Sequence, residues 1–277
     1  AGDIILDADG DDIKFNGSGN LRYEFKLDST PQMNVTGGNF DIQNQTDDAD
    51  IIFKGSDGGS AVTALTLDMS AAGAAAFNNS ITYSGDLISS TSGTSNFRAG
   101  VNAGNSIASG GNYNTVIGDE AGTALTSGDN NTAIGFEALS TEDANGNNTA
   151  IGYRALKTLD AGADGNNTAI GVDAGLSLTT GTGHTLVGGN AGDALTAGND
   201  NVAIGKDALS SDTMGSGNVA IGIVALQDQN FTTATNAYNV AIGRSAGRNI
   251  TTGTLNTLIG GLAGDAITTG NSNVAVG

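Results

Sequence analysis

The sequence Asn131-Thr132-Ala133-Ile134-Gly135 is one of ten similar phrases between residues 114 and 277. Each phrase has Asn or His, then Thr or Val, a small or aliphatic residue, Ile or Val, and Gly. The residue numbers of successive glycines differ by 17, with one difference of 19 and one of 21. A short, fixed period is typical of a chain that stacks similar units along one axis. The ten glycines are Gly118, Gly135, Gly152, Gly171, Gly188, Gly205, Gly222, Gly243, Gly260 and Gly277.

The period also restricts what each unit contains. A strand, a crossover helix and two turns need a unit of roughly 30 residues. The repeat is too short for them. It is long enough for two short strands and two turns, which make one coil of a β-solenoid. The extra residues of the two longer units fall in expected turns, at 161–165 and 230–237. The sequence therefore predicts an all-β fold in which residues 113–277 form a parallel β-solenoid, or β-roll, of about ten coils.

The predicted core is thin. An alanine follows each of the first nine glycines by three residues, and each coil offers only three or four aliphatic side chains, among which we expect Ile134 and Ile221 to be buried. A rod of about ten coils would be on the order of 45 Å long. We expect three identical columns to associate through the small-residue face, which makes the solenoid a homotrimer. The alternative is a monomer whose alanines fill a narrow interior.

Two phrases, at residues 131–135 and 218–222, resemble the head repeat of trimeric autotransporter adhesins, Asn-Ser-Val-Ala-Ile-Gly. The resemblance implies a parallel β-roll of three chains that adheres to surfaces. This chain differs in its longer period and in the Ala-Leu or Ala-Gly pair after each glycine. The longer variant looks like repeats of phage tail-fibre proteins, especially those of marine phages. The resemblance covers residues 112–277.

Residues 1–83 form a different predicted region. Short β-runs such as Asp50-Ile51-Ile52-Phe53-Lys54 alternate with turn clusters such as Ser56-Asp57-Gly58-Gly59, a pattern that indicates an all-β segment. Residues 50–77 resemble stretches of tail fibres from phages that infect marine cyanobacteria. Residues 84–112, rich in Ser, Gly, Asn and Thr, are a predicted connector between two fibre segments. We expect the repeat region to continue past residue 277.

Composition restricts the partners. The chain has 29 acidic and 10 basic residues, and its net charge of −19 opposes binding to nucleic acid or to an anionic membrane. It has no cysteine, which excludes disulfides and thiolate metal sites. No apolar run approaches the roughly 18 residues of a membrane helix. We expect neither nucleic-acid binding nor membrane insertion.

Few residues suggest chemistry. The single histidine, His184, occupies the slot that Asn fills in the other phrases, so we interpret it as a turn variant in a ladder. Glu120 and Glu137 share a slot in successive coils. They would lie about 5 Å apart, the separation of retaining glycosidases. Arg154 and Asp173 continue the same slot, which favours a solvated charge ladder. The sequence therefore predicts a protein that is not an enzyme and carries no cofactor.

The acidic stretch at residues 7–12 is the one weak indication of a metal. Asp7, Asp9 and Asp11 offer carboxylates of the kind that calcium prefers. The stretch departs from an EF-hand loop, because Gly10 comes too early and Ser18 stands where the bidentate Glu belongs. An acidic turn between strands is the alternative interpretation, and we predict no metal site.

These observations favour a structural and adhesive fibre of a virion: a stiff homotrimeric tail fibre that attaches to host-surface glycan or another envelope component and joins other fibre or tail proteins. Ladders of Asn, Thr, Asp and Tyr at the turns would touch the glycan, and Phe231 and Tyr238 in the longest insertion are candidate sugar-stacking residues. A bacterial trimeric surface adhesin or extracellular filament is the alternative. A capsule-degrading tailspike enzyme is less well supported, because it needs a groove with paired carboxylates and aromatic sugar platforms, and the aromatic residues are few. An ice-binding threonine column from Thr115 to Thr185 is a fourth hypothesis, although valines interrupt it.

Overall fold

A computed structural model describes the backbone of residues 12–17, 20–26, 32–35, 42, 49–70, 74–77 and 93–277. Side chains are described for residues 42, 49–70, 75 and 93–277. The described residues form strands and turns and contain no helix. The chain divides into two compact units, residues 1–85 and 86–277, which are treated separately below. The all-β fold class is therefore confirmed.

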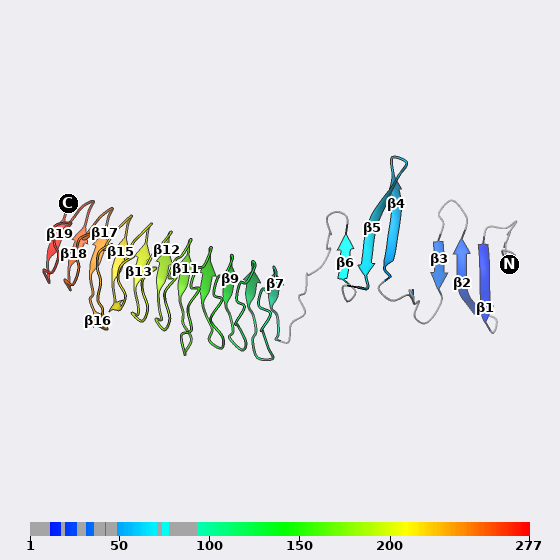
Figure 1. Cartoon of the computed structure of the whole chain (residues 1–277), viewed down its shortest axis with the longest axis horizontal. Helices are drawn as coiled ribbons and strands as arrows, with labels where there is room; N and C mark the ends of the chain where they lie inside the picture. The colour runs from blue at the N-terminus through cyan, green and yellow to red at the C-terminus, as the bar shows by residue number, and fades with distance from the viewer. Residues whose placement is uncertain are drawn as a thin grey trace. The chain divides into compact units, whose positions relative to one another are not determined.

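The first unit contains two antiparallel three-stranded sheets (Figure 1). In each sheet, consecutive strands are neighbours, as expected for β-runs separated by short turns. One sheet has the order β1-β2-β3 and the other the order β4-β5-β6. Their bounds are β1 (Asp12–Gly17), β2 (Asn20–Lys26), β3 (Gln32–Val35), β4 (Ile51–Asp57), β5 (Ser60–Asp68) and β6 (Ala74–Phe77).

The β4–β5 hairpin shows how the sequence sets a turn. Asp57 pairs with Ser60, and the two residues between them, Gly58 and Gly59, have φ values of 57° and 84°. Positive φ at both central residues is the requirement of a type I′ hairpin turn, and glycine meets it without steric cost. The predicted turn at residues 56–59 is confirmed.

The second unit is the predicted parallel β-solenoid. Its main sheet has 11 strands, each pairing in register with the strand of the next coil (Figure 1). Each of these strands ends directly before a glycine, as expected. The strands are β7 (Phe97–Ala99), β8 (Thr115–Ile117), β9 (Thr132–Ile134), β10 (Thr149–Ile151), β11 (Thr168–Ile170), β12 (Thr185–Val187), β13 (Val202–Ile204), β15 (Val219–Ile221), β17 (Val240–Ile242), β18 (Thr257–Ile259) and β19 (Val274–Val276).

The solenoid begins one coil earlier than expected. Strand β7 lies inside the predicted connector of residues 84–112 and pairs with β8. Its phrase, Asn96-Phe97-Arg98-Ala99-Gly100, keeps only the Asn and the Gly of the repeat. Arg98 takes the strand-centre slot and donates from Nη1 to the Gly104 carbonyl at 3.0 Å. A polar residue therefore covers the first rung of the apolar core.

Each coil generally has one strand, where two are expected. The half of the coil after the glycine is a run of turns, such as Ala121 N–H donating to the Gly118 carbonyl at 3.3 Å. The second and fourth residues after the glycine have positive φ, for example Glu137 at 53° and Leu139 at 51°. Such residues cannot continue an extended strand. A second strand pair exists only between β14 (Gly215–Ser216) and β16 (Thr235–Asn236) among the described coils.

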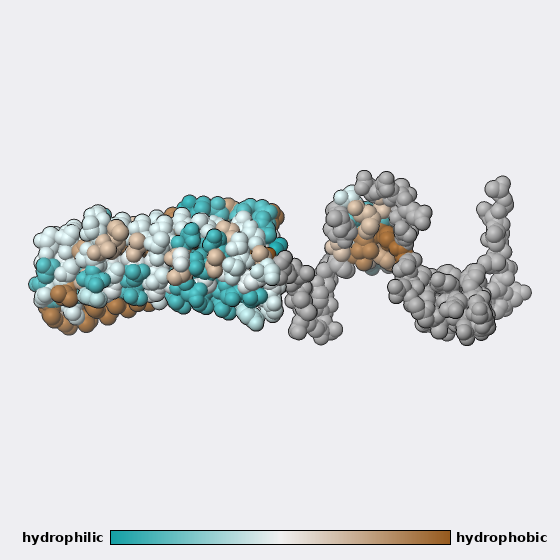
Figure 2. Space-filling view, turned by 90° about the horizontal axis from the view of Figure 1, so that it is seen from below, coloured by the Kyte–Doolittle hydropathy of each residue, from teal (hydrophilic) through white to brown (hydrophobic). Residues whose placement is uncertain are grey.

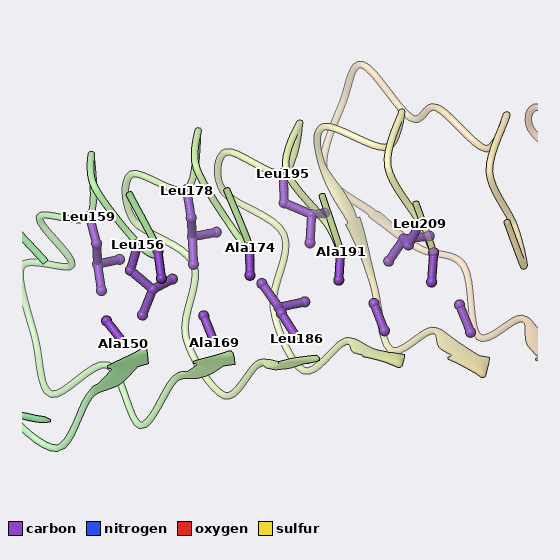
Figure 3. Packing of buried hydrophobic residues seen from close by; sticks show 14 of the residues in the cluster. Ala150, Leu156, Leu159, Ala169, Ala174, Leu178, Leu186, Ala191, Leu195 and Leu209 are labelled. Atoms are coloured by element: carbon purple, nitrogen blue, oxygen red, sulfur yellow. The ribbon is translucent and has the colours of Figure 1, made fainter. Parts of the chain in front are cut away.

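The central residue of each strand faces the interior. Ala133 and Ala220 have no exposed surface, whereas Ile134 and Ile221, the next residues along the same strands, are only half-buried. The expectation that these isoleucines occupy the core is therefore wrong. The post-glycine alanines, such as Ala138, are also fully buried, so they fill each column's own interior and are unavailable for contact between columns. Figure 3 shows alanines and leucines from both sides of the coil pointing toward one another.

The sizes of two interior side chains compensate each other: the strand-centre residue and the fourth residue after the glycine. Where the strand centre is large, as at Leu186, the fourth residue after the glycine is Gly192. A Cβ at Gly192 would lie 2.9 Å from Leu186 Cδ2 and 2.8 Å from Leu195 Cδ1. Where that fourth residue is leucine, as at Leu156, the strand centre is alanine. Close packing explains this pairing, because the narrow coil has room for one of the two large side chains.

Buried asparagines and one histidine form a ladder along the rod, at the position directly before each strand of the main sheet. Asn114 donates from Nδ2 to the Gly128 carbonyl at 2.8 Å and accepts at Oδ1 from the Asn131 N–H at 2.8 Å. At the next rungs the backbone N–H again donates to the side chain of the preceding rung. The partner of the side-chain Nδ2 varies, since Asn148 donates to the Gly146 carbonyl and Asn218 donates to Asn201 Oδ1. Unpaired polar groups inside the coil would be costly, so each rung satisfies the backbone of the next. These asparagines are inside the rod, so their side chains are not available to a ligand. The buried rungs are Asn96, Asn114, Asn131, Asn148, Asn167, His184, Asn201, Asn218, Asn239 and Asn256, and the partly buried Asn273 follows them.

Candidate functional site

The candidate functional surface is the outer face of the solenoid sheet, which consists of the first and third residue of each of its strands. Two residues in each of 11 strands give 22 residues, and none of them is charged. The chain as a whole carries 29 acidic and 10 basic residues, so this neutral face differs from its average surface. In-register pairing repeats the face about every 4.8 Å along the rod.

The outer face becomes more apolar toward the C-terminal coils. The first residue of the strand is Thr from β8 to β12 but Val in β13, β15, β17 and β19. Figure 2 shows apolar residues gathered along one edge of this part of the solenoid. Exposed contiguous apolar residues of this kind mark interaction surfaces. The exposed aliphatic residues on the outer face are Ile170, Ile204, Ile242, Ile259, Val274 and Val276.

The threonine column predicted from Thr115 to Thr185 is real and lies in register on the outer face. It shares that face with the Ile column, so threonine and isoleucine alternate across each strand. The valines that replace threonine from Val202 onward end the column after five rungs. An ice-binding threonine surface therefore stays a hypothesis restricted to five coils.

The position directly after the glycine is aromatic in two successive coils, which places an aromatic pair beside the outer face. Phe136 and Tyr153 stack with ring centroids 5.5 Å apart and an interplanar angle of 14°. The Arg154 guanidinium carbon lies 4.8 Å from the centroid of the Tyr153 ring. The tyrosine ring is therefore in contact with both an aromatic ring and a guanidinium group. The exposed edges of the pair extend the apolar surface toward the charge ladder.

The predicted charge ladder lies in the slot two residues after the glycine. Glu120 accepts a hydrogen bond from Asn102 Nδ2 at 2.7 Å, and Glu137 pairs with Lys157 Nζ at 2.7 Å. Arg154 donates to both carboxylate oxygens of Asp173, at 2.8 and 2.9 Å. Each carboxylate thus has its own partner. The arrangement is a chain of surface pairs, as the sequence indicates for these four residues.

His184 is a buried rung of the asparagine ladder. Its Nε2 lies 2.7 Å from the Gly198 carbonyl, and its Nδ1 accepts from the Asn201 N–H at 3.3 Å. A neutral ring with the proton on Nε2 reproduces the donor and the acceptor of an asparagine amide. Burial lowers the pKa of His184 below its usual 6.5, which favours that neutral form. The structure therefore supports the ladder interpretation of His184, although the rung is interior rather than at a turn surface.

Two buried carboxylates position the two insertions, a role that the sequence analysis missed. Glu142 accepts from the Ala161 N–H at 3.3 Å, and Asp212 accepts from the Phe231 N–H at 3.0 Å. Both stand seven residues after a glycine, where most coils have Leu or Ile. Burial raises the pKa of both groups. The signal in the sequence is an acidic residue at a position that is usually Leu or Ile, in the coil directly before each of the two longer repeats.

The predicted sugar-stacking pair does not form a joint platform. The Phe231 side chain is 6% exposed and packs inside the insertion, whereas Tyr238 is 53% exposed. The Tyr238 ring covers Gly217, since a Cβ there would lie 2.6 Å from Tyr238 Cδ1. One ring face is therefore occupied by backbone. Of the two residues, only Tyr238 has surface to offer a ligand.

The weak calcium alternative at Asp7, Asp9 and Asp11 lies outside the described residues. Within the described part, the donor atoms of Glu142, Asp143 and Asp160 lie within 4.8 Å of one another. The Glu142 oxygens already accept hydrogen bonds from Asn145 and Ala161. Hydrogen bonds that hold the insertion account for the position of Glu142, so the group carries no argument for a metal.

Comparison with known proteins adds no relative. No protein-family model matches the chain, and neither the curated proteins nor the solved structures include one that is significantly similar. Across the described residues, we find no helical segment with the length and apolarity needed to cross a bilayer.

Proposed function

We propose that this chain is part of a structural and adhesive fibre: a homotrimeric rod of a virion tail fibre that contributes to attachment to host-surface glycan. The observation that carries the proposal is the uncharged, periodic outer face on an otherwise acidic solenoid. The resemblance of the repeat to phage-fibre and trimeric-adhesin repeats supports the same assignment.

The outer face is the proposed seam between the three chains. A rod can cover this face continuously only with a partner of the same repeat, and another copy of the chain has that repeat in register. The absence of charge on the 22 outer-face residues lets acidic copies approach there, since net charge elsewhere would repel them. Burial of its isoleucines and valines would supply the apolar area that each thin column lacks.

Attachment without catalysis is the activity that we propose for the assembled rod. The carboxylates that share a slot, Glu120 and Glu137, are engaged in separate hydrogen bonds and ion pairs. The one histidine is a buried ladder rung. Three chains with equivalent coils would strengthen weak contacts through multivalency.

Light scattering on the whole chain tests the assembly. We expect a mass of about three chains, and we expect Ile221→Asp to release folded monomers because the substitution places a charge in the seam. Ser210→Asp, which lies away from the outer face, is the matched control. A wild-type monomer at micromolar concentration would contradict the proposal. Adhesion is tested separately by binding the trimer to an array of bacterial surface glycans, where binding to none of them counts against attachment.

A further inference from the structure

Positive charge is scarce in the solenoid, and half of it is neutralised by paired acids. The coils from residue 93 onward have six basic residues. Lys157 and Lys206 pair with acids at 2.7 and 3.2 Å, Arg154 pairs with Asp173, and Arg98 donates to a backbone carbonyl. The remaining two are the exposed Arg244 and Arg248. Neither has a carboxylate within ion-pair distance among the described residues.

Arg244 and Arg248 line the same open pocket, which has a volume of about 460 Å³. Its other lining residues are Ser245, Gly261 and Leu262. The volume falls in the range of small-molecule sites, roughly 300–1,000 Å³. Both arginines therefore line the same open depression, so a ligand in it has both residues as neighbours.

The repeat explains why the cavity exists at this coil. Arg244 follows Gly243, and the next coil has Gly261 in the same slot, where most other coils have side chains such as Tyr153 and one has Gly189. A Cβ at Gly261 would meet nothing within 4 Å, so this slot is open. The Leu262 N–H donates to the Arg244 carbonyl at 2.9 Å, which fixes the two coils against each other. Leu262 is 61% exposed and provides an apolar wall.

One arginine is already oriented. Arg248 donates from Nε to Gln227 Oε1 at 3.1 Å, which holds the side chain while leaving its terminal N–H groups for a ligand. The Arg248 N–H donates to the Ser245 carbonyl at 3.3 Å in the turn that brings the two arginines to one side. Guanidinium groups bind carboxylate and sulfate through paired, charge-assisted hydrogen bonds.

We propose that this pocket, the arginine pocket, binds an acidic sugar residue of an anionic surface glycan. The carboxylate or sulfate group lies between Arg244 and Arg248, and the apolar side of the sugar ring lies on Leu262. This inference rests on the proposed attachment function and names the class of glycan. An acidic saccharide fits better than a nucleic acid, because two arginines on a chain of net charge −19 cannot follow a phosphate backbone.

Calorimetric titration of the whole chain tests the pocket. The probes are a uronic-acid trisaccharide and a sulfated disaccharide, with a neutral trisaccharide as control. We expect one or both acidic probes to bind, and the affinity to fall at least tenfold in the double variant Arg244→Ala/Arg248→Ala. Lys206→Ala, which removes a paired cation on the same rod, is the matched control and should retain binding. Because both arginines are exposed, thermal unfolding should show that the variants fold.

Several results would overturn the inference. Absence of binding by both acidic probes, equal binding of the neutral probe, or unchanged affinity in the double variant would each do so. A further contrary result is loss of the trimer in Arg244→Glu/Arg248→Glu, with no acidic probe bound by the wild type, because it would assign the arginines to a contact between copies. A failed titration with an intact trimer that binds neutral glycans would remove only the arginine pocket and leave the attachment function standing.

Discussion

The two faces of the solenoid sheet share one backbone but differ in burial and in how strictly the size of their side chains is constrained. From β8 to β18, the strand-centre residue on the inner face is Ala, Val or Leu with no exposed surface. On the outer face, the residues beside it are Thr, Val or Ile and retain part of their exposure. Inner positions vary in size only where a neighbouring slot compensates, as Gly192 does for Leu186. The inner face therefore sets the fold of one chain, and the outer face is free to serve a partner.

The largest expected difference between the inner and the outer face is the loss of stability when an aspartate is placed on each. We expect Ala220→Asp to destabilise the fold by about 3 to 5 kcal/mol, because an unpaired charge would be enclosed in the coil. Ile221→Asp, one residue away, should cost about 1 kcal/mol in the isolated chain, because its side chain can reach water. Thermal unfolding followed by circular dichroism measures both. Equal losses in the two variants would contradict the assignment of inner and outer residues.

The asparagine ladder should be the next most sensitive part of the interior. Asn201→Ala removes the donor to the Gly215 carbonyl and the acceptor for the Asn218 N–H. Each buried group left without a partner costs about 1–3 kcal/mol, so we expect a loss of about 2–5 kcal/mol. Asn249→Ala is the control, since this exposed side chain makes one bond, to the Asp265 carbonyl. A chemical denaturation midpoint that is the same in both variants would show that the ladder does not stabilise the coils.

The balance between interior slots can be tested by exchanging its two members. Gly192→Leu alone should cost about 1–3 kcal/mol, because the new side chain would overlap Leu186. The backbone there also has a positive φ, which leucine adopts less readily than glycine. Adding Leu186→Ala should recover part of that loss, since the coil would then copy the arrangement of Ala150, Leu156 and Leu159. A double-mutant cycle of unfolding free energies measures the coupling, which we expect to be favourable by about 1 kcal/mol. Simple additivity would mean that the two slots do not share space.

A further expected effect is a pH dependence of stability at His184, the one rung that is not asparagine. The pKa of His184 is lowered in the folded chain, so the unfolded chain binds the proton more tightly. Stability should therefore fall as the pH drops below about 6.5, by up to about 1.4 kcal/mol per pH unit until the folded-state pKa is reached. His184→Asn should remove this component, because the amide keeps both hydrogen bonds.

Unfolding of both proteins between about pH 7.5 and pH 5 isolates the histidine. Glu142 and Asp212 have raised pKa values and give the opposite trend, stabilising the fold as the pH falls toward their pKa. These carboxylates are common to both proteins, so they cancel in the difference. Parallel curves for the wild type and His184→Asn would show that the ring is not buried as a neutral rung.

Much of the architecture follows from the sequence by itself. The regular period, the glycines that end the strands and the placement of the extra residues in turns are sufficient for a parallel β-solenoid. The charge ladder of Glu120, Glu137, Arg154 and Asp173 also follows, since residues in one slot of successive coils must be neighbours. These features depend only on position within the repeat, so a one-dimensional pattern contains them.

Only the tertiary structure decided which residues of the repeat face the interior of the coil. Alternation along Thr132-Ala133-Ile134 predicts two faces but cannot say which is the core, and the narrow coil selects the smaller Ala133. The asparagine column also faces inward. There each side chain can donate to a buried backbone carbonyl and accept from the backbone N–H of the next rung. The pocket lined by Arg244 and Arg248 includes the open slot at Gly261 in the following coil. Burial and the lining of a pocket are properties of neighbouring coils in space, and the order of residues alone does not contain them.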